Sequence, residues 1–145
     1  MITRNSQTVV QALAPNPRSR LIVGVLSLME WVVQKNLEDY KRYREHLEFF
    51  SRFIPRIKNV SYKKEKLNGV PAEWITPRGV RNDKLLYYLH GGGYMVCSTN
   101  THKRLVSKIS AEAGMRAVGI NYRLAPENTF PAAVEDSVNG YKAIL

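Results

Sequence analysis

The second half of the chain alternates short apolar runs with helical stretches, and this alternation limits the fold more than any other feature of the sequence. Residues 85–89 and 117–122 are short, nearly continuous apolar runs, as expected of strands that are covered on both faces. A helical stretch follows each run, at residues 101–113 and 131–145. Strands that alternate with helices at this spacing predict parallel strand–helix–strand units, so the fold class is α/β.

The first third of the chain predicts helices. Residues 18–54 have a helical pattern, and Pro55 is expected to end it. The most apolar part, residues 21–33, predicts a buried helix, with a membrane-surface helix as the alternative. No apolar run reaches the length of about 18 residues that would indicate a membrane span, and no small-residue cleavage site follows this one. We therefore expect no stable membrane span and a cytoplasmic protein.

A hairpin is predicted between these helices and the alternating half. Residues 57–67 and 70–75 are strand-like. They are separated by Asn68-Gly69, a dipeptide that tight hairpin turns prefer. The hairpin should therefore contribute two antiparallel strands to the sheet.

Charge and cysteine content exclude several classes of protein. The 145 residues carry a formal net charge of +10, from 22 Lys and Arg against 12 Asp and Glu, which first suggests a nucleic acid as partner. The basic residues alternate with acidic ones, however, as on solvated helix faces, and no nucleic-acid-binding motif occurs, so we expect no such partner. The single cysteine, Cys97, excludes a disulfide-stapled scaffold. Metal-site and nucleotide-binding motifs are also absent, so no metal and no cofactor are expected.

Three adjacent glycines follow the apolar run 85–89, in the order His90-Gly91-Gly92-Gly93-Tyr94. Glycine weakens strands, but it allows the backbone to turn sharply and to approach a ligand closely. In an open α/β sheet, ligands bind outside the carboxyl ends of the strands. Peptide N–H groups at such a place can stabilise a developing oxyanion. From the glycines alone, a plain glycine-rich turn remains an equal alternative.

A second block of residues decides between these alternatives. After the run 117–122 the chain reads Tyr-Arg-Leu-Ala-Pro-Glu at residues 122–127, Phe-Pro-Ala-Ala at residues 130–133, and then Asp136. Together the two blocks resemble the hormone-sensitive lipase group of α/β-hydrolases, which includes bacterial acetyl esterases and arylacetamide deacetylases. That group has HGGG[FY] after its third strand and YRLAPE…FPAA…D after its fourth.

The resemblance implies a fold and a domain plan. It covers residues 57–145 strongly, as the N-terminal half of a doubly wound α/β-hydrolase domain. More loosely, the helices within residues 1–56 resemble the helical segment that caps the active site in that group. It also implies a serine carboxylesterase or lipase lineage that acts on small-molecule esters with short acyl chains and needs no cofactor.

Roles for individual residues follow from the same resemblance. Gly91, Gly92 and Gly93 match the loop whose N–H groups form the oxyanion hole. His90 matches a histidine that holds this loop in shape, and we do not expect it to be the general base. Tyr94 matches an aromatic position at the mouth of the site.

Three charged residues of the second block match supporting positions in the family. Arg123, Glu127 and Asp136 are expected to hold the loop that follows the fourth strand. Surface ion pairing is an equally weighted alternative for each of them.

The catalytic triad is missing from the expected order of motifs. The nucleophile elbow G-x-S-x-G does not occur in the 145 residues, and no histidine follows His102, whereas this fold orders its triad as Ser, Asp or Glu, and then His. We therefore expect the 145-residue chain alone to be inactive. It is expected to be the front half of a protein about twice as long, or a remnant left by a frameshift or an early stop.

The same comparison predicts an exposed sheet edge. The family orders its strands 1-2-4-3-5-6-7-8, so a chain without strand five leaves the apolar strand at residues 85–89 bare on one side. A bare apolar edge favours self-association. The alternative function is accordingly a non-catalytic fragment or assembly module that binds through this edge.

Overall fold

The computed structural model describes residues 39–145 of the chain. The chain splits into two compact units, Met1–Tyr43 and Arg44–Leu145. The predictions for the apolar run 21–33 and for the first part of the helical segment lie outside the described residues. The first described helix, α3 (Tyr40–Ser51), ends four residues before Pro55.

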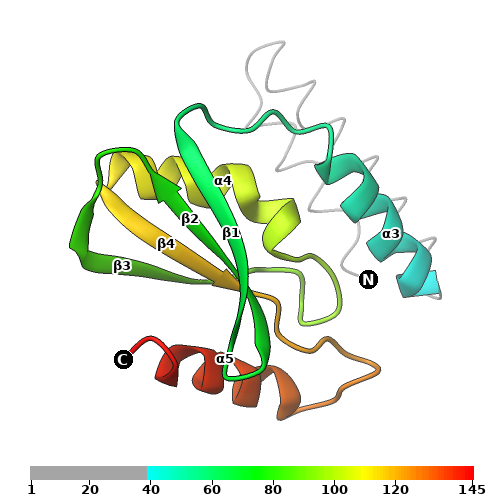
Figure 1. Ribbon diagram of the computed structural model, residues 1–145. Helices are drawn as coiled ribbons and strands as arrows, with labels where there is room; N and C mark the ends of the chain where they lie inside the picture. The colour runs from blue at the N-terminus through cyan, green and yellow to red at the C-terminus, as the bar shows by residue number, and fades with distance from the viewer. Residues whose placement is uncertain (1–38) are drawn as a thin grey trace, which may run out of the picture. The chain divides into compact units, whose positions relative to one another are not determined.

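The second unit contains one four-stranded sheet with the strand order β1-β2-β4-β3 (Figure 1). The hairpin strands β1 (Val60–Leu67) and β2 (Val70–Pro77) pair antiparallel. Asn68 and Gly69 between them have φ angles of +46° and +84°, as a type I′ turn requires. The predicted hairpin and its turn are confirmed.

The alternating half of the chain forms the predicted parallel unit. Strand β3 (Arg81–Leu89) leads through helix α4 (Thr99–Glu112) to strand β4 (Met115–Ile120), and β3 and β4 pair in parallel. Helix α5 (Ala132–Lys142) follows. The strand order and the α/β class agree with the expected front part of an α/β-hydrolase sheet.

Helices α4 and α5 cover opposite faces of the sheet. Because side chains of a strand alternate between its faces, neighbours in β4 enter two separate apolar clusters. Ala117 packs with Ile75 and with Val106 of α4. Val118 packs in the other cluster, which Ala133 of α5 joins. Buried on both faces, β4 forms the centre of this core, and Ala117 and Val118 are both fully buried.

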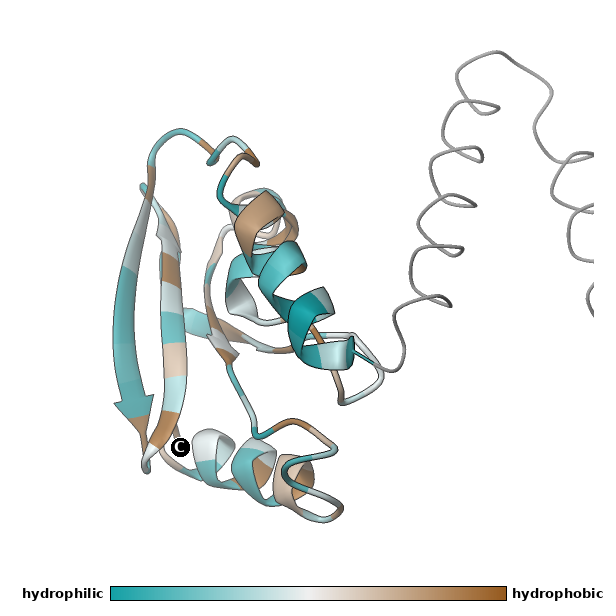
Figure 2. Cartoon of the chain, turned by 90° about the vertical axis from the view of Figure 1, so that its right-hand side faces the viewer, coloured by the Kyte–Doolittle hydropathy of each residue, from teal (hydrophilic) through white to brown (hydrophobic). Residues whose placement is uncertain are grey.

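The two edges of the sheet differ in chemistry. Strand β1 is hydrophilic over most of its length (Figure 2), and lysines on an edge strand discourage pairing with another chain. Strand β3 forms the other edge, and its last residue, Leu89, is 47% exposed. The prediction that residues 85–89 are covered on both faces is therefore wrong for this end of the strand within the described chain.

Element limits also differ from those that hydropathy predicts. Strand β3 begins at Arg81, earlier than hydropathy predicts. Its first residues are polar and pair irregularly with β4, so no apolar run marks them. The last helix is shorter than predicted and ends at Lys142. Among the described residues, no helix is both long and apolar enough to cross a membrane.

Candidate active site

The loop that follows β3 turns sharply at its glycines. Gly92 and Gly93 have φ angles of +122° and +60°, and the first of these is a conformation that only glycine adopts readily. The Gly92 carbonyl oxygen accepts hydrogen bonds from the N–H groups of Met95 and Val96, each at 3.1 Å. A Cβ atom on Gly92 would lie 2.1 Å from the carbonyl oxygen of Val96. The turn therefore excludes every other residue at position 92.

Several N–H groups of this turn, those of Gly92 and Gly93 among them, have no partner within the described residues. Within residues 39–145, no hydrogen bond is donated by the N–H of Gly92 or of Gly93. Gly93 is exposed and Gly92 is half-buried. Peptide N–H groups held in a rigid turn, with their hydrogens unused, are suited to bind an oxygen that carries negative charge.

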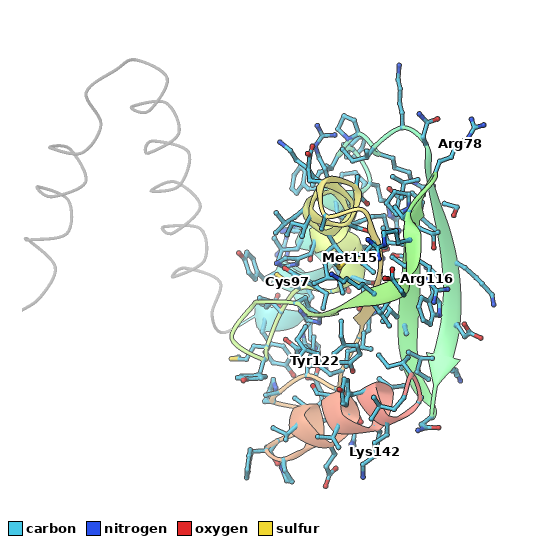
Figure 3. The ribbon with its side chains drawn as sticks, turned by 90° about the vertical axis from the view of Figure 1, so that its left-hand side faces the viewer. Arg78, Cys97, Met115, Arg116, Tyr122 and Lys142 are labelled. Atoms are coloured by element: carbon cyan, nitrogen blue, oxygen red, sulfur yellow. The ribbon has the colours of Figure 1, made fainter. Side chains whose placement is uncertain are left out.

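His90 contacts the glycine turn and packs on Tyr122. Its side chain is buried, and its ring stacks on the ring of Tyr122 with centroids 4.2 Å apart and planes at 9°. Its Nδ1 lies 2.9 Å from the carbonyl oxygen of Gly91, to which a protonated Nδ1 donates. The Tyr122 hydroxyl donates to the His90 carbonyl oxygen at 2.5 Å. Figure 3 shows Tyr122 between helix α5 and the loop that carries Cys97.

Burial keeps both of these rings neutral. Burial lowers the pKa of His90, and the neighbouring His102 lowers it further. The hydrogen bond to the Gly91 carbonyl opposes this shift. Burial also raises the pKa of Tyr122 to about 12. The buried His90 imidazole is therefore engaged with the backbone of its own loop, and its role in holding the loop stays a prediction.

The loop after β4 is anchored to α5 by an ion pair. The Nε of Arg123 lies 3.0 Å from both carboxylate oxygens of Asp136, and the backbone N–H of Arg123 donates to the same carboxylate at 2.8 Å. Burial alone would raise the pKa of Asp136, but the hydrogen bonds and charge of Arg123 outweigh burial and lower it. Glu135 adds a second contact to the guanidinium at 3.0 Å.

Arg44, which the sequence analysis did not single out, joins the two loops. Its Nε donates to the Met95 carbonyl oxygen in the glycine loop and its Nη2 to the Ala125 carbonyl oxygen in the other loop, each at 2.5 Å. Both Nη atoms also contact the Glu127 carboxylate, at 2.9 and 3.0 Å. Arg44 lies on the charged face of an amphipathic helix, among other charged residues. Nothing in the sequence therefore distinguishes it from its neighbours.

A second residue of α3 contacts the start of α4. Ser98 caps α4, and its hydroxyl donates to the carboxylate of Glu48. The side-chain amide of Asn100 donates to the same carboxylate at 3.0 Å. A negative charge at this position also interacts favourably with the helix dipole. Like Arg44, Glu48 was not recognised from the sequence.

An apolar hollow of about 630 Å³ adjoins the glycine loop. The predicted residues that line it are His90, Gly91, Gly93 and Tyr94. Its other walls come from Tyr122 and from the side of α5 that carries Val134, Val138 and Tyr141. Tyr94, 63% exposed, lies at its rim. The lining does not include the other three predicted residues, Arg123, Glu127 and Asp136. Their contacts are with neighbouring loops and helices.

No metal centre forms among residues 39–145, where no three His, Cys, Asp or Glu side chains come close enough to share an ion. The residues that line the hollow are instead glycines of the turn, uncharged aromatic residues and residues with small or aliphatic side chains. The described lining of the hollow therefore contains no Asp, Glu, Lys or Arg side chain.

The strand order β1-β2-β4-β3, with a glycine turn at the carboxyl end of β3, is the one expected for the front part of an α/β-hydrolase sheet. Comparisons with known proteins also indicate the α/β-hydrolase class. A family model described as alpha/beta hydrolase fold matches residues 86–145. An acetyl-hydrolase of Streptomyces hygroscopicus is 44% identical over 75 residues, which are 51% of this chain and 24% of that protein. An esterase of Acinetobacter venetianus is 29% identical over 102 residues, 70% of this chain and 33% of that protein.

Solved structures narrow the class. An esterase of the bacterial hormone-sensitive lipase family superposes with a TM-score of 0.66 at 44% identity, over 70% of this chain and 34% of that one. A hormone-sensitive lipase from a metagenome library gives 0.69 at 32% identity, over 79% and 40%. The chain carries part of the α/β-hydrolase fold and is similar to the hormone-sensitive lipase group, and its named relatives support a lineage of carboxylic-ester hydrolases. It spans 24% and 33% of the length of the two curated relatives.

Substitutions in the glycine turn test its geometry. We expect Gly93→Ala to lower the free energy of unfolding by about 1–2 kcal/mol, the cost of a left-handed conformation with a Cβ atom, because no atom lies within 4 Å of that position. Gly92→Ala should cost clearly more, because its Cβ would meet the Val96 carbonyl oxygen at 2.1 Å. Urea unfolding with an unchanged m-value measures both. An equal loss in the two variants would show that the turn is not constrained at Gly92.

Replacement of Arg44 tests the junction of the loops. We expect Arg44→Gln to lower the free energy of unfolding by about 2 kcal/mol, because two carbonyl oxygens lose a charged donor. Arg42→Gln, on an exposed residue of the same helix, is the matched control and should change stability by less than about 0.5 kcal/mol. If both variants unfold at the same urea concentration, Arg44 does not stabilise the loops.

Proposed function

We propose that this chain supplies the oxyanion hole of a serine carboxylesterase that acts on short acyl esters. The observation that carries the proposal is that the N–H groups of Gly92 and Gly93 have no partner within the described residues, in a turn whose Gly91 and Gly93 line an apolar hollow. The names of similar proteins support the short acyl chain. Besides the acetyl-hydrolase, an ethyl acetate hydrolase of Pseudomonas putida is 40% identical over 60 residues, 41% of this chain and 19% of that protein.

The proposed mechanism uses the loop at the step where charge develops. A serine hydroxyl attacks the ester carbonyl, and the carbonyl oxygen becomes the oxyanion of a tetrahedral intermediate. The N–H groups of Gly92 and Gly93 donate to that oxygen, each stabilising the transition state by about 3 kcal/mol. Collapse of the intermediate expels the alcohol and leaves an acyl-enzyme, which water then hydrolyses.

The other described residues hold this geometry and take no part in proton transfer. His90 and Tyr122 engage the carbonyl oxygens of Gly91 and His90 and so hold the start of the turn. Gly91 lines the hollow beside them, and Tyr94 borders its entrance. Arg123, Glu127 and Asp136 hold the facing loop. The acyl group occupies the apolar space against α5.

A chimera tests the proposal. Residues 86–145 would replace the corresponding segment of the Streptomyces hygroscopicus acetyl-hydrolase, which supplies the rest of the enzyme. We expect the chimera to hydrolyse p-nitrophenyl acetate, and Gly92→Ala to lower kcat by about 100-fold, because it displaces an oxyanion donor. Gly114→Ala is the matched control: Gly114 also has a positive φ, of +63°, with no atom within 4 Å of an added Cβ. Its kcat should not change.

The 145-residue polypeptide alone provides the complementary measurement. It contains no G-x-S-x-G motif, so it should hydrolyse p-nitrophenyl acetate no faster than its Gly92→Pro variant. Turnover above that variant would contradict the proposed division of roles. A kcat that falls equally for Gly92→Ala and Gly114→Ala in the chimera would overturn the oxyanion assignment.

A second candidate function is assembly through the β3 edge. On its outer side β3 pairs with no strand of the described residues, and α5 exposes Val134, Val138 and Tyr141 beside it. An unpaired apolar edge of this kind can pair with the same edge of a second copy.

Sedimentation at increasing protein concentration tests this second candidate. The 145-residue chain should self-associate, and Leu89→Lys should shift it toward the monomer because a charge at the edge opposes pairing. Leu105→Lys, on the exposed side of α4, is the control and should leave association unchanged. A monomer at all concentrations, or an equal effect of both variants, would exclude the edge as an assembly surface.

A further inference from the structure

A second cavity, of about 670 Å³, lies on the α4 side of the sheet. Its walls come from residues 51–56, from β1 and β2, and from the first half of α4. It shares no lining residue with the hollow beside the glycine loop. Its volume is typical of cavities that bind small molecules, and the proposed esterase mechanism makes no use of it.

Basic side chains dominate the lining of this cavity. Five basic residues face two acidic ones, Glu48 and Glu73; the basic residues are Arg52, Arg56, Lys64, Lys103 and Arg104. Glu48 is already engaged at the start of α4. The lining therefore carries a net positive charge of about three, and a low-dielectric pocket lined by one sign of charge concentrates ions of the opposite sign.

Part of this basic surface is held in place. Lys103 and Arg56 both stand over the ring of Tyr62, at 5.2 and 5.4 Å from its centroid. A guanidinium of Arg104 donates to the Pro55 carbonyl oxygen at 2.7 Å. Ordered cations lose less conformational entropy when they bind an anion than mobile surface lysines do.

Glu73 leaves one hydrogen-bonding position unfilled at the wall of the cavity. The residue is 2% exposed, and its Oε1 accepts from Lys103 Nζ at 2.8 Å. Its Oε2 has no hydrogen-bond partner within residues 39–145. A buried carboxylate oxygen without a donor costs free energy, so this position favours a ligand that brings one.

We propose that this cavity binds a small phosphate ester that also carries a hydroxyl group. Phosphate monoesters have a charge of about −1.5 to −2 near neutral pH, which matches the excess of cations, and arginine and lysine both bind phosphate oxygens. The hydroxyl group donates to Glu73 Oε2. This oxygen is screened from solvent, so the Lys103 side chain must leave its place beside Glu73 as the ligand enters, whereas Arg56 and Arg104 keep theirs.

Two ligands of equal length test the proposal by isothermal titration calorimetry on the 145-residue chain. Glycerol 3-phosphate has hydroxyl groups beside its phosphate, and propyl phosphate has none. We expect one-to-one binding of glycerol 3-phosphate and about tenfold weaker binding of propyl phosphate, the usual effect of a lost hydrogen bond to a charged group. Glu73→Gln should remove most of this difference.

A pair of exposed lysines on one strand gives the matched control. Lys64 lines the cavity, whereas Lys66, two residues further along β1, does not. Lys64→Gln should weaken both ligands about threefold, as expected for a partly screened charge, and Lys66→Gln should leave both unchanged. Equal weakening by the two variants, equal affinity for the two ligands, or no saturable binding at millimolar concentration would each overturn the proposal.

Discussion

Two loops that lie 30 residues apart in the chain are held as one unit by the guanidinium group of Arg44. It donates to one carbonyl oxygen in each loop and pairs with the carboxylate of Glu127. The loops also touch directly, through the N–H of Ala125 and the carbonyl oxygen of Tyr94 at 2.8 Å. A planar group with five fixed donors can satisfy three acceptors in different directions, and lysine cannot reproduce this geometry. The position of the glycine turn therefore depends on a helix far from it in sequence.

The parallel pairing of β3 and β4 explains why the loops meet at all. Both strands end at the same edge of the sheet, Leu89 opposite Ile120, so the segments that follow them must leave side by side. Tyr122 then reaches across to the His90 carbonyl oxygen. The N–H groups of Gly92 and Gly93, by contrast, have no partner among residues 39–145 and are available to a ligand.

Sequence patterns predicted correctly those turns and strands that short stretches of residues determine by themselves. The Asn68-Gly69 turn follows from backbone preference, and β4 from a continuous apolar run. The site motifs lie in the two loops that follow β3 and β4, where Arg123 and Asp136 pair, and the roles that the resemblance implies for them stay predictions. Arg44 escaped detection, since its partners lie 51 to 83 positions away and nothing in the helix pattern marks them.

Hydropathy alone did not show the exposed edge, which only the family resemblance predicted, and no sequence pattern marked the basic cavity. Hydropathy reports how apolar a strand is, and it does not report how many neighbours a strand has, so residues 85–89 read as fully covered. Glu73 is a charged residue at a strand position that alternation assigns to the core, and its burial became interpretable only with Lys103 beside it.

The two faces of the sheet create opposite environments for ligands. Toward α5, neutral rings and aliphatic side chains border the glycine turn, so an uncharged molecule loses little hydration there, and under the proposed function the N–H dipoles act on the charge that forms later. Toward α4, arginine and lysine surround a buried carboxylate, so only a ligand that is already charged gains from entry. Since β4 is buried between these faces and contributes to the core on each, a ligand on the α4 face can alter the α5 face only by shifting a close-packed strand. The two cavities should therefore fill independently of each other.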